Sequence, residues 1–209
     1  MRPLPTFYEE KLLWNKGINL VAGIDEVGRG AFAGPLVTAA VIFPKNCVFV
    51  DSDLHTINDS KVLSPKRRQI LSEKIKNAAL CYSINEIPLS YINKYGIGKA
   101  AQLGFYHSVK TLITPPDFCL IDAFFISRVK KTIQKPIIKG DSLSISIAAA
   151  SIIAKVHRDE LMEKLHQLVP MYNFSQNKGY GTKFHREQIK IHGLSSFHRL
   201  SFNLSPFLD

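Results

Sequence analysis

The chain has few of the features that mark disulfide-rich, zinc-binding or membrane-spanning proteins. Its 209 residues include three cysteines, Cys47, Cys81 and Cys119, and no Cys-x-x-Cys pair. An odd number of widely spaced cysteines argues against a disulfide framework and against a zinc site. The most apolar segment, Ile145 to Ala154, has about half of the ~20 residues that a helix needs to cross a bilayer. We therefore expect no membrane span.

The N-terminus also lacks the features of a secretion signal. Two glutamates, Glu9 and Glu10, lie within the first ten residues, and no continuous apolar stretch of signal-peptide length is present. These features predict a cytoplasmic protein.

Acidic residues are scarce relative to basic ones. The chain has 17 Asp and Glu against 27 Lys and Arg, which gives a formal net charge of +10. Its 45% hydrophobic content excludes a disordered chain, and its charge predicts contact with phosphate, in nucleic acid or anionic lipid. No strongly basic amphipathic helix with bulky aromatic residues is present, which favours nucleic acid. The clustered basic residues are Lys66, Arg67, Arg68, Arg128, Lys130, Lys131, Lys135, Lys183, Arg186, Lys190 and Arg199.

No repeat, low-complexity tract or Gly/Ser linker divides the sequence. We predict one domain over residues 1–209, with about 170–209 as a C-terminal helical and loop extension. Apolar periodicity and capping residues predict five helices: Thr6 to about Trp14, one beginning at Ser64-Pro65, Ile97–Leu112, Ser142–Leu168, and Lys183–His192 ending at Gly193. The predicted strands are Leu20–Val27, Leu36–Phe43, Leu80–Ile87, Phe118–Phe124 and Pro136–Lys139. This order indicates an α/β fold with a mixed sheet covered by helices.

Four acidic residues lie at the ends of apolar segments. Asp25 and Glu26 end LVAGIDEV, Asp122 lies in FCLIDAFF, and Asp141 precedes the longest helix. Burying several like charges together is unfavourable unless cations neutralise them, and Mg²⁺ or Mn²⁺ bound by oxygen ligands is the usual solution. The four acids therefore predict a divalent metal site.

Simpler interpretations remain open for each acid. Asp141 could cap the following helix, Asp122 could accept local hydrogen bonds, and Asp25 and Glu26 could lie at a solvated strand end. Adjacent strand residues also point to opposite faces, so we expect the chain to leave strand geometry at Glu26.

The segment after this pair, GRGAFAGP, has too little side chain for a core strand. Backbone amides beside Gly28 and Gly30 could donate to a phosphate or a sugar hydroxyl, while Arg29 supplies charge. A structural turn is the alternative interpretation.

Six motifs occur in the order that is typical of type 2 ribonuclease H (ribonuclease HII): GIDEVGRGAFAGPLVTAAVIF, NDSKVLSPKRR, LIDAF, KGDSLSISIAAASIIAKVHRD, KGYGTKFH and FHRLSF. The chain resembles this family from about Val21 to Phe202. The resemblance implies an RNase H-like fold, with a central five-stranded mixed sheet and helices on both sides. It also implies hydrolysis of RNA strands paired with DNA.

The resemblance assigns roles to particular residues. The family's catalytic and metal-binding acids correspond to Asp25, Glu26, Asp122 and Asp141. Its substrate-binding residues correspond to Gly28, Arg29, Gly30, Lys61 and Tyr180, where the tyrosine senses the RNA-to-DNA junction. His185 is a possible accessory residue that could shuttle a proton, cap a helix or contact phosphate. Ala123 departs from the family, which often has glycine after the third aspartate.

The implied reaction is hydrolysis assisted by two Mn²⁺ or Mg²⁺ ions, which leaves a 5′-phosphate and a 3′-hydroxyl. The enzyme would also incise at a single ribonucleotide embedded in duplex DNA. We expect a monomer, with a replication clamp as a candidate partner. The alternatives are another metal-dependent nuclease of the same fold and a non-catalytic module that binds RNA–DNA hybrids.

Overall fold

The computed structural model describes residues 4–45, 47, 53–58 and 60–208. Five strands form one sheet in the order β3-β2-β1-β4-β5. They are β1 (Val21–Val27), β2 (Leu36–Ile42), β3 (Cys81–Ile87), β4 (Phe118–Asp122) and β5 (Gln134–Ile137). The pairs β1/β2 and β2/β3 are antiparallel, and β1/β4 and β4/β5 are parallel. The predicted five-stranded mixed sheet is confirmed.

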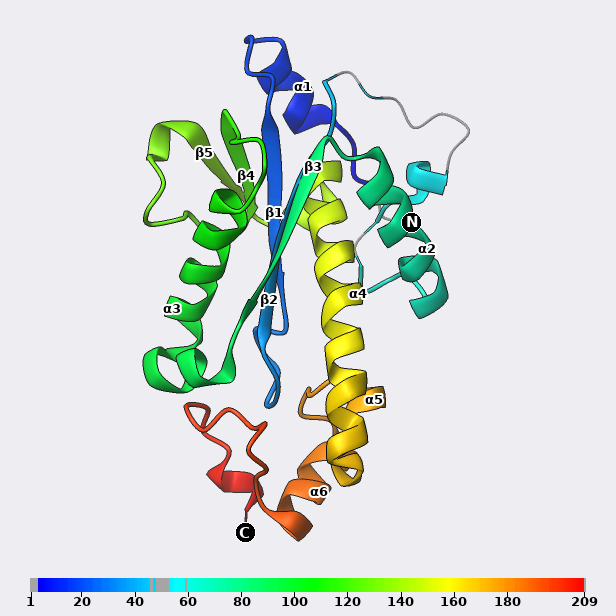
Figure 1. Cartoon of the computed structure of the whole chain (residues 1–209), viewed down its shortest axis with the longest axis vertical. Helices are drawn as coiled ribbons and strands as arrows, with labels where there is room; N and C mark the ends of the chain where they lie inside the picture. The colour runs from blue at the N-terminus through cyan, green and yellow to red at the C-terminus, as the bar shows by residue number, and fades with distance from the viewer. Residues whose placement is uncertain (1–3, 46, 48–52, 59, 209) are drawn as a thin grey trace.

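Helices cover both faces of this sheet (Figure 1). The helices are α1 (Tyr8–Trp14), α2 (Pro65–Ala78), α3 (Leu89–Lys110), α4 (Ile145–Leu168), α5 (Phe174–Asn177) and α6 (Lys183–His192). Short 3₁₀ turns are η1 (Asp53–Thr56), η2 (Lys131–Ile133), η3 (Gly140–Ser142), η4 (Pro170–Tyr172) and η5 (Ser205–Phe207). Helix α4 contacts β1 and β2 on one face, α3 contacts β2 and β3 on the other, and α2 packs on α4.

The alternation of side chains along the central strands produces two cores. In β2, Val37 and Val41 belong to the core beneath α4, whereas Leu36 and Ala40 belong to the core beneath α3. Helix α4 lies so close to β1 that a Cβ at Gly23 would be 2.1 Å from the carbonyl carbon of Ser146. This close approach holds α4 beside the strand that carries Asp25 and Glu26.

Several predicted boundaries are confirmed and others are corrected. Helix α4 begins at Ile145 rather than Ser142, and β5 spans Gln134–Ile137 rather than Pro136–Lys139. Helix α2 begins at Pro65 after the N-cap Ser64, and α6 ends at His192 before Gly193. Helix α1 begins at Tyr8, two residues after Thr6, and α3 begins at Leu89, eight residues before the predicted start. Strand β4 ends at Asp122 because the next residue, Ala123, has a φ of 59°.

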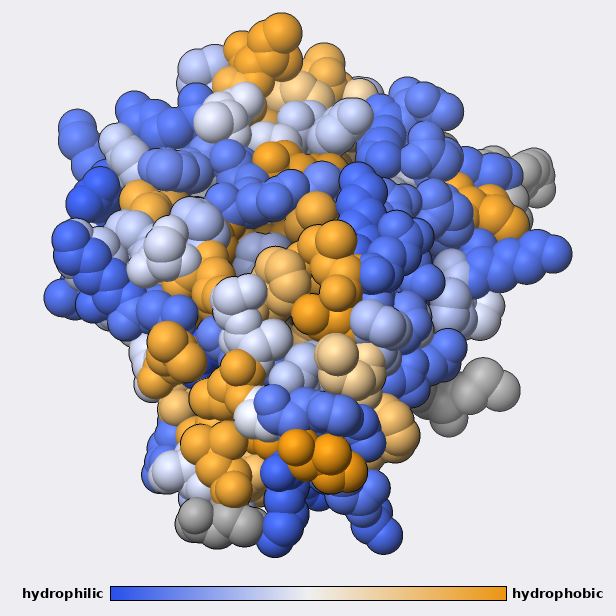
Figure 2. Space-filling view, turned by 60° about the horizontal axis from the view of Figure 1, so that its bottom comes forward, coloured by the Kyte–Doolittle hydropathy of each residue, from blue (hydrophilic) through white to orange (hydrophobic). Residues whose placement is uncertain are grey.

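The residues after α4 form a small core of their own. Buried Tyr172, Phe174 and Ile189 pack around Met162 of α4 and Ala33. Figure 2 brings this end of the molecule forward and shows apolar side chains bordered by hydrophilic ones. The three cysteines are free, and none of the described helices is long and apolar enough to span a membrane.

Candidate active site

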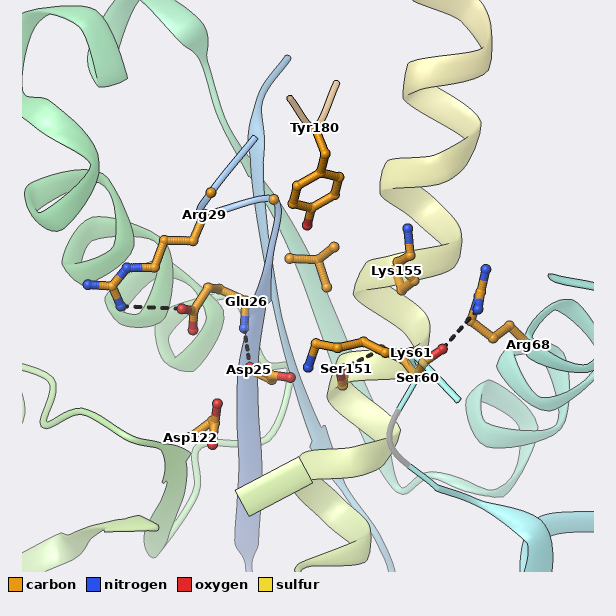
Figure 3. A pocket seen from close by; sticks show the side chains of 13 residues that line it. Asp25, Glu26, Arg29, Ser60, Lys61, Arg68, Asp122, Ser151, Lys155 and Tyr180 are labelled. Carbon is orange, nitrogen blue, oxygen red and sulfur yellow. Dashed lines mark hydrogen bonds and ion pairs between the residues drawn. The ribbon is translucent and has the colours of Figure 1, made fainter. Parts of the chain in front are cut away.

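A cavity of about 550 Å³ lies where β1 and β4 end, between α4 and the segment before α2 (Figure 3). Its lining includes eight of the ten residues selected from the sequence: Asp25, Glu26, Gly28, Arg29, Gly30, Lys61, Asp122 and Tyr180. Asp141 and His185 are not part of that lining. The cavity therefore brings together three of the four acids and all the expected substrate-binding residues.

Two neighbouring parallel strands position Asp25 and Asp122. Ile24 of β1 pairs with Ile121 of β4, so the aspartate that follows each isoleucine lies at the same level of the sheet. Asp25 is buried, with 4% of its surface exposed. Parallel pairing thus brings together two carboxylates that are distant in the sequence.

Glu26 does not leave strand geometry as we expected. It pairs with Thr38 of β2 inside β1, and the strand continues to Val27. Asp25 and Glu26 point to different sides of β1, yet both border the cavity because it extends across the strand end (Figure 3). The chain turns only at Gly28, where φ is 94° and a Cβ would be 2.1 Å from Nε of Arg158.

Burial and mutual repulsion destabilise the charged forms of these acids. Burial, followed by the charges of Glu26 and Asp122, holds the pKa of Asp25 well above its usual value. Burial raises the pKa of Glu26 to about 7, with a further contribution from Asp122, although the Arg29 guanidinium opposes the shift. Arg29 Nη1 lies 3.4 Å from Glu26 Oε1, while Glu26 Oε2 is buried without a hydrogen-bond partner.

A divalent cation fits this set of donors. All three acids in the cavity offer carboxylate oxygens, which hard cations such as Mg²⁺ and Mn²⁺ prefer, and a cation would reverse the raised pKa values. In the described part of the chain, however, no three acidic, histidine or cysteine side chains are arranged to hold one ion as they stand. Asp25 Oδ1 accepts from the Glu26 amide at 2.7 Å, and Asp122 Oδ1 accepts from the Gly140 amide at 2.8 Å. Each of these hydrogen bonds uses one oxygen of the carboxylate and fixes the orientation of the side chain.

Asp141 lies beside the cavity rather than in it. It is buried in η3, and its Oδ2 accepts from Lys61 Nζ at 2.9 Å. The N-cap of α4 is Ser144, so the helix-capping interpretation of Asp141 is wrong. The expected cluster of four acids is thus only partly formed, with Asp141 connected to it through Lys61 and through its neighbour Gly140.

The expected substrate-binding residues surround the acids. Arg29 lies with its guanidinium carbon 4.3 Å from the centre of the Phe124 ring, and the Lys61 side chain is 72% exposed. The Tyr180 side chain points into the cavity from the side opposite Asp122 (Figure 3). These residues place positive charge and an aromatic ring at the rim of an acidic centre.

His185 occupies a different environment from the expected one. Its ring is fully buried among aromatic residues of the C-terminal core, and Nδ1 lies 2.9 Å from the Tyr180 carbonyl oxygen. Its amide donates to Oγ1 of the N-cap Thr182. A proton-shuttling or phosphate-binding role does not agree with this position.

Three polar lining residues were not selected from the sequence: Ser60, Ser151 and Lys155. Arg68, selected from the sequence only as one of the clustered basic residues, also lines the cavity. Ser60 and Ser151 hydroxyls are 3.0 Å apart. Ser151 and Lys155 are four residues apart on α4 and so share one face, which is the sequence signal that could have identified them.

A family model for ribonuclease HII matches residues 22–205. The chain belongs to the ribonuclease HII family. The ribonuclease HII of Herpetosiphon aurantiacus is 42% identical over 203 residues, covering 97% of this chain and 98% of the relative. That of Wolbachia pipientis subsp. Culex pipiens is 46% identical over 195 residues, covering 93% and 96%. The chain is thus a metal-dependent ribonuclease H of type 2, a class that acts on RNA–DNA hybrids.

Solved structures share the fold. Ribonuclease H2 from Pyrococcus horikoshii OT3 aligns with a TM-score of 0.70 at 24% identity, covering 90% of this chain and 95% of that one. Bst-RNase HIII in complex with Mn²⁺ gives 0.71 at 22% identity, covering 90% and 68%. The RNase HII of Archaeoglobus fulgidus in its PCNA complex gives 0.64 at 25% identity, covering 86% and 92%.

Proposed function

We propose that this ribonuclease HII hydrolyses the RNA strand of RNA–DNA hybrids and also incises at single ribonucleotides embedded in duplex DNA. The products would be a 5′-phosphate and a 3′-hydroxyl, because the attacking oxygen comes from water. The observation that carries this proposal is the cavity in which Asp25, Glu26 and Asp122 lie opposite Tyr180 and beside Gly28–Gly30.

Asp25, Glu26 and Asp122 would hold the catalytic metal, and Asp141 would complete a second site after release from Lys61. A pair of divalent cations, when bound, would supply a hydroxide near neutral pH and stabilise charge on the leaving 3′-oxygen. Support for Mn²⁺ comes from the related Bst-RNase HIII, which was solved in complex with Mn²⁺, and Mg²⁺ prefers the same oxygen ligands.

The other lining residues would bind the substrate without reading base identity. Amides of the loop Gly28–Arg29–Gly30 would donate to the ribose or its phosphate, and Lys61 would contact a phosphate. The Tyr180 ring would stack on the sugar that follows the junction, where an additional 2′-hydroxyl would crowd it. Its 36% exposure leaves the ring accessible to a substrate.

The decisive experiment offers duplex DNA with one embedded ribonucleotide to the wild type and to Asp25→Asn. We expect incision on the 5′ side of the ribonucleotide, dependent on Mg²⁺ or Mn²⁺, and a loss of at least about 100-fold in the variant. Glu73→Gln is the matched control, because it makes the same carboxylate-to-amide change on an exposed part of α2 and should keep full activity.

Three results would contradict the proposal. Equal activity of Asp25→Asn would remove Asp25 from the reaction, and activity in a chelator would remove the metal. Equal cleavage of a duplex without any ribonucleotide would favour a different nuclease of the same fold.

We also propose a replication clamp as a partner, supported by the Archaeoglobus fulgidus RNase HII that was solved with PCNA. Size-exclusion chromatography of this chain with the sliding clamp of its own organism tests the proposal. Co-elution is expected, and separate elution at micromolar concentration would contradict it.

A further inference from the structure

The C-terminal FHRLSF motif has no role in the function described so far, yet two of its residues are fully buried beside the cavity. His198 and Arg199 both have 0% exposure. Their segment pairs with the loop after Gly28–Arg29–Gly30: the Gly34 amide donates to the Phe197 carbonyl at 2.9 Å, and the Arg199 amide donates to the Phe32 carbonyl at 2.7 Å. The motif is therefore hydrogen-bonded to the loop that follows Gly28–Arg29–Gly30.

His198 belongs to a chain of hydrogen bonds that ends at Tyr180. The Ser195 amide lies 2.9 Å from His198 Nδ1, His198 Nε2 lies 3.0 Å from His185 Nε2, and His185 Nδ1 lies 2.9 Å from the Tyr180 carbonyl oxygen. Each of these contacts has a suitable length for a hydrogen bond.

Only one set of neutral tautomers satisfies this chain. The Ser195 hydroxyl also lies 2.8 Å from His198 Nδ1 and can either donate or accept, but the Ser195 amide, directed at the same atom, can only donate. His198 Nδ1 therefore accepts, and His198 carries its proton on Nε2. The carbonyl of Tyr180 can only accept, so His185 carries its proton on Nδ1 and offers a bare Nε2. His198 Nε2–H therefore donates to His185 Nε2, and every donor meets an acceptor.

Arg199 connects the same segment to the other recognition element. Its guanidinium donates to the carbonyl oxygens of Arg29 at 2.9 Å, Gly34 at 3.0 Å and Pro35 at 3.2 Å. Adjacent residues of one motif thus reach the Gly28–Arg29–Gly30 loop and, through His185, the Tyr180 backbone.

The Tyr180 loop is anchored at each successive carbonyl. Arg158 donates to the Lys178 oxygen at 2.8 Å, the Phe32 amide donates to the Gly179 oxygen at 2.7 Å, and His185 donates to the Tyr180 oxygen. The Tyr180 oxygen also accepts from the Thr182 amide at 2.8 Å, and the Arg158 guanidinium carbon lies 5.6 Å from the centre of the Tyr180 ring. His185 is the side chain that donates to the backbone of Tyr180 itself.

We propose that His198, held by Arg199, is a positioning residue that fixes Tyr180 relative to the Gly28–Arg29–Gly30 loop through His185. We call the contacts from His198 through His185 to Tyr180 the relay. Loss of the relay should impair incision at an embedded ribonucleotide more than cleavage of a continuous hybrid, because a continuous hybrid offers many positions without a junction. This inference rests on the proposed role of Tyr180 as the junction sensor.

The surroundings keep both histidines neutral. Both rings pack against the Tyr172 and Phe174 rings, with ring centres 4.8–6.2 Å apart. The Tyr172 hydroxyl donates to the Gly193 carbonyl. Burial, and then the charge of His185, lowers the pKa of His198 to about 4, and burial lowers the pKa of His185. Protonation of either ring would place two N–H donors against each other.

Nitrogen-15 NMR of the wild-type protein at pH 7 tests the relay without any substitution. We expect a protonated Nδ1 and a bare Nε2 for His185, and the opposite pattern for His198. The reverse tautomer at either residue, or a charged ring, would overturn the inference.

Enzyme kinetics test the predicted effect of the relay on substrate preference. The measured quantity is the ratio of kcat/KM on duplex DNA with one ribonucleotide to kcat/KM on a continuous hybrid. His198→Leu removes the donor, and we expect this ratio to fall about tenfold. His198→Gln, which retains an N–H donor near the position of Nε2, should restore most of the ratio, and His192→Leu on the exposed end of α6 should leave it unchanged. Thermal unfolding of each variant shows that the folded protein is compared.

Failure of the relay can be distinguished from failure of the proposed function. If the wild type does not incise at the embedded ribonucleotide, or Tyr180→Ala keeps the wild-type ratio, the junction sensor and the relay both fail. If Tyr180→Ala lowers the ratio while His198→Leu keeps it, only the relay is overturned.

Discussion

Buried charged residues around the cavity are stabilised in two different ways. Arg158 and Arg199 are fully buried, and both donate to backbone carbonyl oxygens of the loop that follows Gly30. Asp25 and Glu26 instead share a cavity with a third acid, and their pKa values are raised. The cations are satisfied by the fold itself, whereas the anions lack sufficient counter-charge, as expected for acids that bind a metal.

Ala123, where the resemblance led us to expect glycine, has a backbone conformation that favours glycine. Its φ of 59° lies in the left-handed region, which costs a residue with a Cβ roughly 1–2 kcal/mol. We predict that Ala123→Gly raises the free energy of unfolding by about 1 kcal/mol, measured by urea denaturation.

The control for this prediction is Ala79→Gly. Ala79 has a φ of −69°, so glycine there relieves no strain and should not stabilise the protein. A decrease in stability for Ala123→Gly, or an equal gain at both positions, would contradict the strain argument.

Elements with local signals could be predicted from the sequence, whereas elements fixed by distant contacts could not. Ser64 caps α2 through its own hydroxyl, which a single sequence reveals. Thr6 lies one residue before the N-cap Phe7, and its hydroxyl accepts from the Tyr8 amide at 3.2 Å. Its backbone also pairs with the residues at the start of α4, because its amide donates to the Leu143 carbonyl and its carbonyl accepts from the Ile145 amide. The start of α3 has no side-chain cap, and the kink at Gly96 obscures the periodicity.

The candidate site likewise combines residues with local sequence signals and residues placed by distant contacts. Asp25, Glu26 and Asp122 could be predicted, because an acid at the end of an apolar run is visible in the sequence. Two features depend on tertiary structure: the pairing of Asp141 with Lys61, 80 residues away, and the burial of His185 against His198. Neither has a local signal.

Glu10 of α1 accepts hydrogen bonds from the start of α4, so its protonation state should affect how stably these two helices are held together. It is fully buried, Oε1 accepts from the Ser144 hydroxyl at 2.6 Å and the Ser146 amide at 3.0 Å, and Oε2 has no partner. Burial raises the pKa of Glu10 above 4.5, although these hydrogen bonds oppose the shift.

The protonated form of Glu10 is therefore favoured by folding. The protonated carboxyl of Glu10 contributes to the free energy of unfolding below pH 4.5, and this contribution is lost as the pH rises through the folded-state pKa. We predict that the Tm of Glu10→Gln, relative to wild type, increases between pH 4 and pH 8, measured by differential scanning calorimetry. Glu9→Gln, which loses the 2.7 Å ion pair with Lys135, should not gain in this way. A constant difference for Glu10→Gln would contradict the raised pKa.

At the scale of the whole molecule, the chain carries a net charge of +10, and the cavity that holds three acids is also lined by the basic residues Arg29, Lys61, Arg68 and Lys155. Binding through phosphates releases counterions, so affinity should depend on salt and little on sequence. We predict that the affinity for an RNA–DNA hybrid in a chelator falls at least about tenfold between 50 and 200 mM salt. Fluorescence anisotropy with two unrelated hybrid sequences measures this effect, and a salt-independent affinity would contradict it.

The central claim is that the carboxylates at the ends of β1 and β4 hold the divalent cation. Calorimetric titration of Mn²⁺ into the wild type, Asp122→Asn and the control Glu73→Gln tests it most directly. We predict saturable binding by the wild type and the control, and an affinity at least about tenfold lower for Asp122→Asn. Equal Mn²⁺ affinity in all three proteins would contradict the account.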